Sequence, residues 1–96
     1  MATLIPAIGK PETVYPEQGK KFKLSELQKL VSSGQSIDRS LIENMPVHPK
    51  RKEDGISYLC NENGLELNLP VNTFMSMYLG YTVLGDVLRI TSKEWS

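Results

Sequence analysis

Side chains able to do covalent or metal chemistry are few in this sequence, since Cys60 is its only cysteine and His48 its only histidine. A zinc site of the usual kind needs several such ligands, so no metal framework is expected. A nucleophilic pair would need Cys60, inside a predicted strand, to meet His48 in a proline-rich loop, with a third group orienting the imidazole. We therefore expect Cys60 to be a small apolar filler, and we expect no enzyme activity, no cofactor and no bound metal.

Two lysine-rich clusters offer a different chemistry, the binding of phosphate groups. The first consists of Lys20, Lys21 and Lys23, and the second of Lys50, Arg51 and Lys52. If the fold brings the clusters together, they form a cationic patch, with Tyr15, Phe22 or Tyr58 available to stack a base. The alternative is that both clusters are solvated loops, since Glu53 and Asp54 directly follow the second one.

A group of apolar side chains near the C-terminus indicates a surface for association. The segment from Thr73 to Leu79 is apolar over much of its circumference if it is helical, and the tryptophan follows later. The members of this group are Phe74, Met75, Met77, Tyr78 and Trp95. Part of the group could form a seam between copies of the chain, giving a homodimer or a larger oligomer. The alternative is that all of it lies in the core of one monomer.

The elements that must position these residues centre on a predicted hairpin. Ile56 to Cys60 is typical of a strand, and Asn63-Gly64 supplies the positive φ angles of a tight turn. Leu65 to Leu69 alternates apolar and polar residues, which predicts the second arm of the hairpin with its three leucines on one face.

A short helix is predicted directly after this hairpin. Pro70 ends the strand because proline has no amide hydrogen to donate. Asn72 is placed to cap a helix from about Thr73 to Leu79 by accepting a hydrogen bond from the amide of Phe74 or Met75. Gly80 suits the left-handed conformation that ends a helix.

The N-terminal third is expected to hold a second hairpin and a second helix. Thr3 to Ile8 and Glu12 to Pro16 predict two short strands around a glycine-containing turn. Ser25 and Gln28 have the spacing of a capping box at the start of a helix, and Gly34 would close that helix after about two turns. A helix this short must be held by packing against the sheet.

The remaining segments carry weaker signals. Residues 35–44 fit either an irregular strand or a loose helical turn, and we favour the strand. Residues 45–54 hold two prolines and a run of charges, which is typical of an exposed loop. Tyr81 to Leu84 and Val87 to Thr91 predict two more strands, separated by a turn at Gly85-Asp86.

Several short motifs are similar to a family of small phage and mobile-element domains of unknown function. They are Asn61-Glu62-Asn63-Gly64, Leu69-Pro70 with Asn72, Gly85-Asp86-Val87, and the helical Leu24, Leu27, Gln28 and Val31. In that family an Asn-Glu-x-Gly hairpin, a Leu-Pro-x-Asn helix start and a late Gly-Asp step recur. The segment from Arg39 to Asp54 is longer than the family pattern. The resemblance implies a bacteriophage or Bacteroidetes-type mobile-element origin, and it implies no reaction.

Charge and hydropathy limit how the chain could bind nucleic acid or a membrane. Eleven Lys and Arg residues balance eleven Asp and Glu residues among 96, so no overall field draws the chain to nucleic acid or to an anionic membrane. Any such binding must be local. No apolar run approaches the ~20 residues of a membrane helix, and the first six residues lack the features of a signal peptide. We therefore expect the cytoplasm, which is that of the host cell if a phage encodes the chain.

These patterns predict one α+β domain over residues 1–96, with an antiparallel sheet of about five to seven short strands and two short helices. The leading hypothesis is a non-enzymatic binding protein that captures a host protein, such as a defence component, or a phosphate-bearing, nucleotide-like small molecule. The alternatives are a regulatory nucleic-acid-binding protein that uses the lysine clusters, and a virion or assembly component. No membrane partner is expected.

Overall fold

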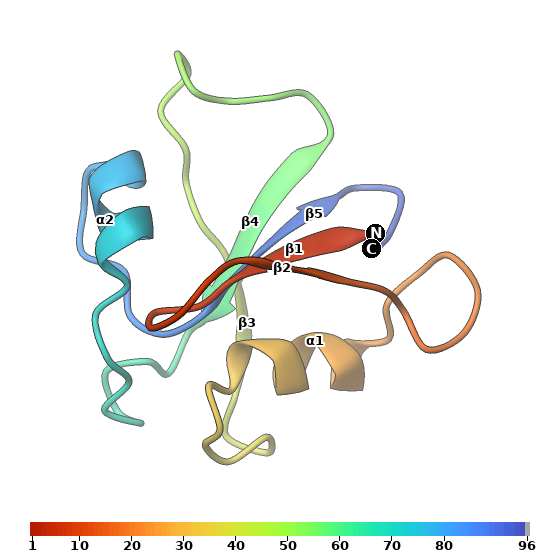
Figure 1. Ribbon diagram of the computed structural model, residues 1–96, viewed down its shortest axis with the longest axis horizontal. Coiled ribbons are helices and arrows are strands. Elements are labelled where there is room, and N and C mark those ends of the chain that lie inside the picture. Colours follow the sequence, from red (N-terminus) through yellow and green to blue (C-terminus); the bar gives the residue numbers. More distant parts are fainter. Residues whose placement is uncertain (96) are drawn as a thin grey trace.

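A five-stranded antiparallel sheet with one helix on each face makes up the computed structural model, which describes residues 1–95 (Figure 1). In chain order the elements are β1 (Ala2–Ile5), β2 (Glu12–Val14), α1 (Leu24–Val31), β3 (Ile42–Asn44), β4 (Ile56–Asn61), α2 (Thr73–Leu79) and β5 (Val87–Thr91). The strands lie in the order β2-β1-β5-β4-β3. The predicted α+β class, with an antiparallel sheet and two short helices, is confirmed.

The last strand occupies the centre of the sheet. β5 pairs with β1 on one side, where Leu4 faces Leu88, and with β4 on the other, where Leu59 faces Leu88. Its residues Val87, Leu88 and Ile90 are almost fully buried. A central strand covered on both faces reads as a nearly continuous apolar run, which is why the sequence predicted this strand correctly.

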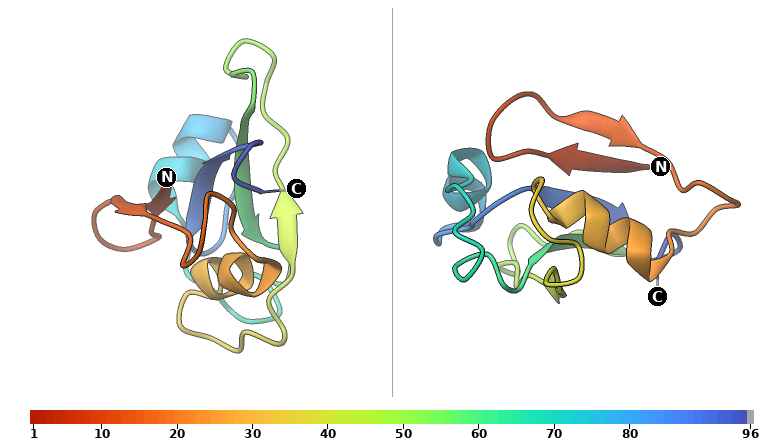
Figure 2. Two further views of the ribbon diagram at one scale, coloured as in Figure 1. Left: turned by 90° about the vertical axis from the view of Figure 1, so that its right-hand side faces the viewer. Right: turned by 90° about the horizontal axis from the view of Figure 1, so that it is seen from below.

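Side-chain alternation along the strands divides the core into two layers. On one face, Leu59 and Leu88 pack with Leu27 of α1 and with Phe22. On the other face, neighbouring positions of the same strands pack against Met75 and Leu79 of α2; they include Ile5, Tyr58, Cys60 and Val87. The left view in Figure 2 shows the helices on opposite sides of the sheet.

The predicted second arm of the central hairpin, Leu65 to Leu69, is wrong. The chain turns helically instead: the Leu67 amide donates to the Asn63 carbonyl, and the Leu69 amide donates to the Gly64 carbonyl. Leu65 is 83% exposed, whereas Leu67 and Leu69 are buried. Gly64 does not adopt the left-handed φ of a hairpin turn, and a Cβ atom added there would lie 3.1 Å from the Leu84 side chain. Close packing, and not turn geometry, explains this glycine.

Two further predictions need correction. Tyr81 to Leu84 is no strand, because its only ladder contact is a single bridge between Val71 and Leu84. The proposed capping box at Ser25 and Gln28 is displaced: α1 begins at Leu24, and the Glu26 carboxylate accepts from the Lys23 amide. Gln28 instead donates to the Ser40 carbonyl, so it fastens the helix to the following loop.

The other local predictions hold. β1 and β2 form the expected antiparallel hairpin. Asn72 caps α2 by accepting from the Met75 amide at 3.1 Å, and Gly80 ends that helix with φ 84°. In the ambiguous segment 35–44, only Ile42–Asn44 is a strand. Residues 45–54 form a loop between β3 and β4 in which Met45 is buried and most other positions are exposed.

Polar side chains of the short motifs noted in the sequence form hydrogen bonds that connect distant parts of the fold. The Asn72 amide group donates to the carbonyls of Ile5 and Gly85, both at 3.0 Å. Asn61 donates to the Val31 carbonyl and to the Ser40 hydroxyl. The Asp86 carboxylate accepts from the Ala7 amide at 2.9 Å. Each bond satisfies a backbone or side-chain group far away in the sequence, so these motif residues have structural roles.

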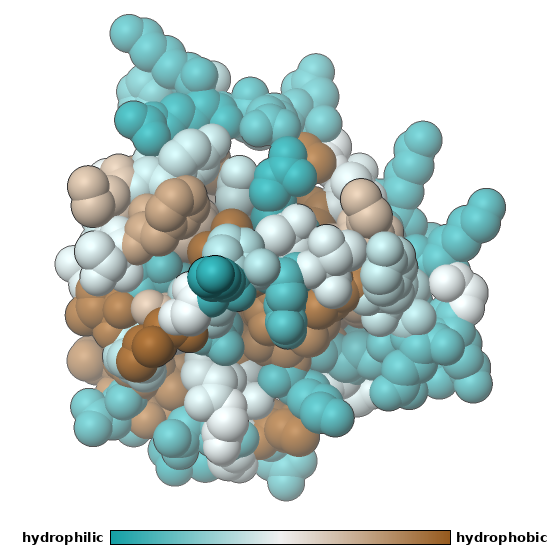
Figure 3. Space-filling view, in the orientation of Figure 1, coloured by the Kyte–Doolittle hydropathy of each residue, from teal (hydrophilic) through white to brown (hydrophobic). Residues whose placement is uncertain are grey.

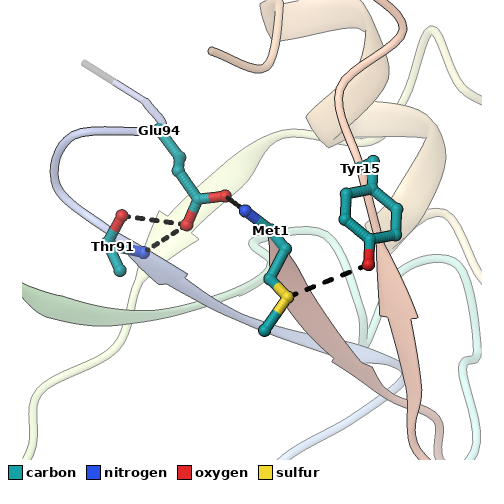
Figure 4. Close-up of polar contacts among 4 residues, drawn as sticks. All are labelled: Met1, Tyr15, Thr91 and Glu94. Carbon is teal, nitrogen blue, oxygen red and sulfur yellow. Dashed lines mark hydrogen bonds and ion pairs between the residues drawn. The ribbon is translucent and has the colours of Figure 1, made fainter. Parts of the chain in front are cut away.

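Met1 and Glu94, which lie near opposite ends of the sequence, are in contact in the folded chain. The buried Glu94 carboxylate forms an ion pair with the Met1 ammonium and accepts hydrogen bonds from the amide and hydroxyl of Thr91 (Figure 4). Burial raises the pKa of Glu94, but hydrogen bonds from the Met1 ammonium and from Thr91 outweigh it, so the pKa is lowered. The Glu94 carbonyl also accepts from the Phe22 amide at 2.7 Å, which ties the segment before α1 to the end of β5.

Candidate functional site

A large cleft lies between the hairpin of β1 and β2 and helix α1. Because α1 has only eight residues and packs against β3, β4 and β5, it leaves the same face of the hairpin uncovered. The resulting space, here named the α1 groove, has a volume of about 700 Å³. Its apolar floor and wall are formed by Leu4, Val14, Phe22 and Leu30, and its rim by Tyr15, Lys23, Lys29 and Glu26.

The charged side chains at this groove differ in whether they already have a bonding partner within the protein. Glu26 accepts hydrogen bonds from the amides of Lys23 and Glu17, and these bonds lower its pKa. Asp86, which also lines the groove, is bonded to a backbone amide. Within residues 1–95, Lys23 and Lys29 form no ion pair. Their ammonium groups are therefore available to an anionic ligand.

The two lysine-rich clusters lie on different loops. Lys23 lines the α1 groove together with Tyr15 and Phe22, two of the three aromatic residues suggested for base stacking. Lys20 and Lys21 are exposed on the connector before α1. Lys50, Arg51 and Lys52 belong to the loop between β3 and β4, which Figure 1 draws at the top of the molecule, away from that connector. The α1 groove is lined by Lys23 of the first cluster, and a separate cleft beside the β3–β4 loop is lined by Lys52 of the second.

A second cleft lies on the opposite face, beside α2. This α2 cleft has a volume of about 260 Å³, and its lining is almost entirely apolar. Its main wall residues are Ile5, Pro11, Phe74, Met75 and Tyr78, and Thr3, Tyr58 and Arg89 complete the lining. Figure 3 shows apolar surface on the left of the molecule, over α2, and in the lower centre, between β1 and α1.

Two arginines and two tyrosines form a layered cluster at the edge of the α2 cleft. The Arg51 guanidinium lies 5.1 Å from the centre of the Tyr78 ring and donates to the Tyr78 carbonyl at 2.5 Å. The Tyr78 and Tyr58 ring centres are 5.9 Å apart. The Tyr58 hydroxyl raises the pKa of Arg89, which also forms an ion pair with Glu53 at 2.9 Å. The cluster fastens the loop between β3 and β4 to α2.

The residues suggested for ligand stacking and self-association separate in the structure. Tyr58 is 6% exposed, so its ring offers no open face for stacking a base. Phe74 is 63% exposed and Met77 is 77% exposed, whereas Met75 is fully buried in the core beneath α2. Tyr78 is half-buried beside them. Trp95 packs against the core on the α1 face, so it shares no surface with α2.

Cys60 and His48 have different surroundings. Burial, together with the nearby Glu43 carboxylate, raises the pKa of Cys60 to about 12, so the thiol stays protonated at neutral pH. His48 is exposed, and its Nδ1 accepts from the Lys50 amide. Among residues 1–95, no three His, Cys, Asp or Glu side chains gather as a metal site. Neither helix in this range is long and apolar enough to cross a bilayer.

Two residues important to these clefts were not singled out from the sequence. Lys29 lies three residues after Glu26, about one helical turn along α1, and lines the groove with it. Arg89 stands alone among apolar residues of β5, and this isolated charge in an apolar strand was the available signal.

No family model, curated protein or solved structure matches this chain. The similarity to phage and mobile-element domains, which depends on short motifs, stays a prediction.

Proposed function

We propose that this chain is a non-enzymatic binding protein, of phage or mobile-element type, that captures a phosphate-bearing small molecule in the α1 groove. The observation that carries the proposal is the convergence of Lys23, Lys29 and Tyr15 around an apolar floor that no other element covers. Sequestration needs affinity and no general base or nucleophile, and the protonated, buried Cys60 agrees with such a role.

The chemistry of the groove suits a ring joined to phosphate. Its volume of about 700 Å³ lies within the ~300–1,000 Å³ typical of ligand pockets. The partly exposed apolar residues Leu4, Val14 and Leu30 offer a surface for a planar base, and exposed Tyr15 can stack on it. The lysines at the rim supply charge-assisted hydrogen bonds to phosphate oxygens.

Calorimetry with linear and cyclic nucleotides tests this proposal. We expect saturable binding of at least one of them at one ligand per chain, with raised thermal stability. The double variant Lys23→Ala/Lys29→Ala should weaken binding by about tenfold or more, because two charged hydrogen bonds are lost. The matched control, Lys50→Ala/Lys52→Ala, removes the same charge from the other cluster and should bind like the parent.

Three results would contradict the proposal. No heat or thermal shift across the panel would remove small-nucleotide capture. Loss of binding in the Lys50→Ala/Lys52→Ala control alone would move the ligand to the other loop. Binding of an oligonucleotide that weakens steeply with salt and involves both clusters would favour nucleic-acid binding instead.

A further inference from the structure

The face opposite the α1 groove carries an apolar surface that the proposed ligand does not use. Met75 and Leu79 hold α2 to the sheet, while Phe74 and Met77 point away from it and are mostly exposed. Phe74 also forms one wall of the α2 cleft, so the exposed helix face continues into a depression. Apolar surface next to a shaped depression is typical of a protein-binding site.

The size of the α2 cleft limits what enters it. Its volume of about 260 Å³ is below the ~300–1,000 Å³ of typical small-molecule pockets. Ile5, Pro11, Phe74 and Tyr78 give it apolar and aromatic walls. A single aromatic side chain inserted from a partner satisfies both the size and the lining, and such anchors dominate the binding energy of many interfaces.

The charges around the cleft indicate an acidic partner. Arg89 lines the cleft and remains about one-third exposed although it pairs with Glu53. Arg51 is held over the ring of Tyr78, which is a wall residue of the cleft. The carboxylate of Glu53 pairs with one of these two arginines, Arg89, so the positive charge of Arg51 is left over and the rim favours a carboxylate from the partner. A guanidinium already positioned by a tyrosine loses little freedom on binding one.

We infer that the α2 cleft docks a partner protein through an aromatic side chain adjacent to an Asp or Glu. The ring enters between Phe74 and Tyr78, and the neighbouring carboxylate binds the exposed side of Arg89. The surrounding apolar residues, including Met77, complete the contact. This site is separate from the α1 groove and does not depend on any nucleotide being bound there.

The direct test uses capped dipeptides and NMR of the full chain. We expect N-acetyl-Asp-Trp-amide to shift the resonances of Phe74, Met75 and Arg89. It should bind about tenfold more tightly than N-acetyl-Lys-Trp-amide, because one charged hydrogen bond contributes about that difference in affinity. N-acetyl-Asp-Ala-amide should give no saturable shift. Arg89→Gln should remove the preference for Asp, whereas the matched Arg39→Gln should retain it.

Further variants separate docking from loss of structure. Phe74→Ala removes an exposed ring and should abolish the Asp-Trp shifts while leaving the thermal midpoint close to that of the parent; Leu65→Ala, at another exposed apolar position, should retain them. Absence of shifts at the cleft in the parent, or equal binding of the Asp and Lys peptides, would overturn the inference. A dimer in light scattering that Phe74→Asp dissociates and Leu65→Asp does not would also overturn it, because a second copy would then cover this face.

Discussion

The two clefts arise in the same way and differ in the chemistry of their rims. Each helix is too short to cover its face of the sheet, so the hairpin of β1 and β2 is left partly open on both sides. On the α1 side the cations are Lys23 and Lys29, which make no ion pair within the described chain. On the α2 side Arg51 and Arg89 are already bound to tyrosines and to Glu53.

The comparison shows how one small sheet can carry two clefts whose cationic side chains differ in mobility. Flexible ammonium groups around an apolar floor adapt to the several oxygens of a phosphate group. Arginines held by aromatic rings keep one orientation, which suits a carboxylate placed by a protein backbone. The following substitutions, ordered by the size of the expected effect, test whether the two sides are independent.

Asn72→Ala should have the largest effect. Its side chain makes three hydrogen bonds, to the Met75 amide and to the carbonyls of Ile5 and Gly85, and it is fully buried. We expect the free energy of unfolding to fall by about 2–4 kcal/mol, because buried groups lose their partners. Urea denaturation measures this fall. The exposed Asn44→Ala should change the value by less than about 0.5 kcal/mol, and an equal loss in both variants would contradict the assigned role.

Gly85→Ala should follow, with a fall of about 2–3 kcal/mol in the same measurement. A Cβ atom there would lie 2.7 Å from Leu69 Cδ1, and φ is +78°. Gly34 has a similar φ of +81° and open space around it, so Gly34→Ala isolates the backbone strain of about 1–2 kcal/mol. If the two variants lose the same stability, packing against Leu69 contributes nothing.

Glu94→Gln should loosen the α1 side and leave the α2 side intact. The pKa of Glu94 is lowered in the folded protein, so its stabilising effect is present above the unfolded pKa of ~4.3 and is lost as pH falls through the lower folded value. At neutral pH we expect a loss of about 1–2 kcal/mol. The variant's stability should also vary less with pH between about 5 and 3 than the parent's, and an unchanged pH profile would contradict this.

Arg51→Ala should have the smallest effect. It removes the contact with the Tyr78 ring and the hydrogen bond to the Tyr78 carbonyl at an exposed position, worth about 0.5–1 kcal/mol together. Amide hydrogen exchange should become faster in the loop between β3 and β4 and stay unchanged in α1. Lys52→Ala is the matched charge control, and faster exchange in α1 would show that the two sides are coupled.

Local patterns in the sequence determined much of this protein. The Asn72 cap, the left-handed Gly80, the N-terminal hairpin and the apolar strand β5 each follow from short-range chemistry, which a linear reading captures. The alternating leucines of residues 65–69 predicted a strand that is absent, because a helical turn stabilised by local hydrogen bonds buries Leu67 and Leu69 equally well. Alternation alone cannot choose between these two outcomes.

Only the tertiary structure decided which of the candidate residues meet. It inserted β5 between β1 and β4, and thereby placed Arg89 beside Tyr58 on one face of the sheet. It brought Lys23 to Tyr15 and Phe22, and left Lys50 to Lys52 on a different loop. Some of these neighbours lie far apart along the chain. Others meet only because a short helix leaves part of the sheet uncovered. Contacts of this kind between different elements are set by packing across the whole domain, so the local propensities of short segments do not predict them.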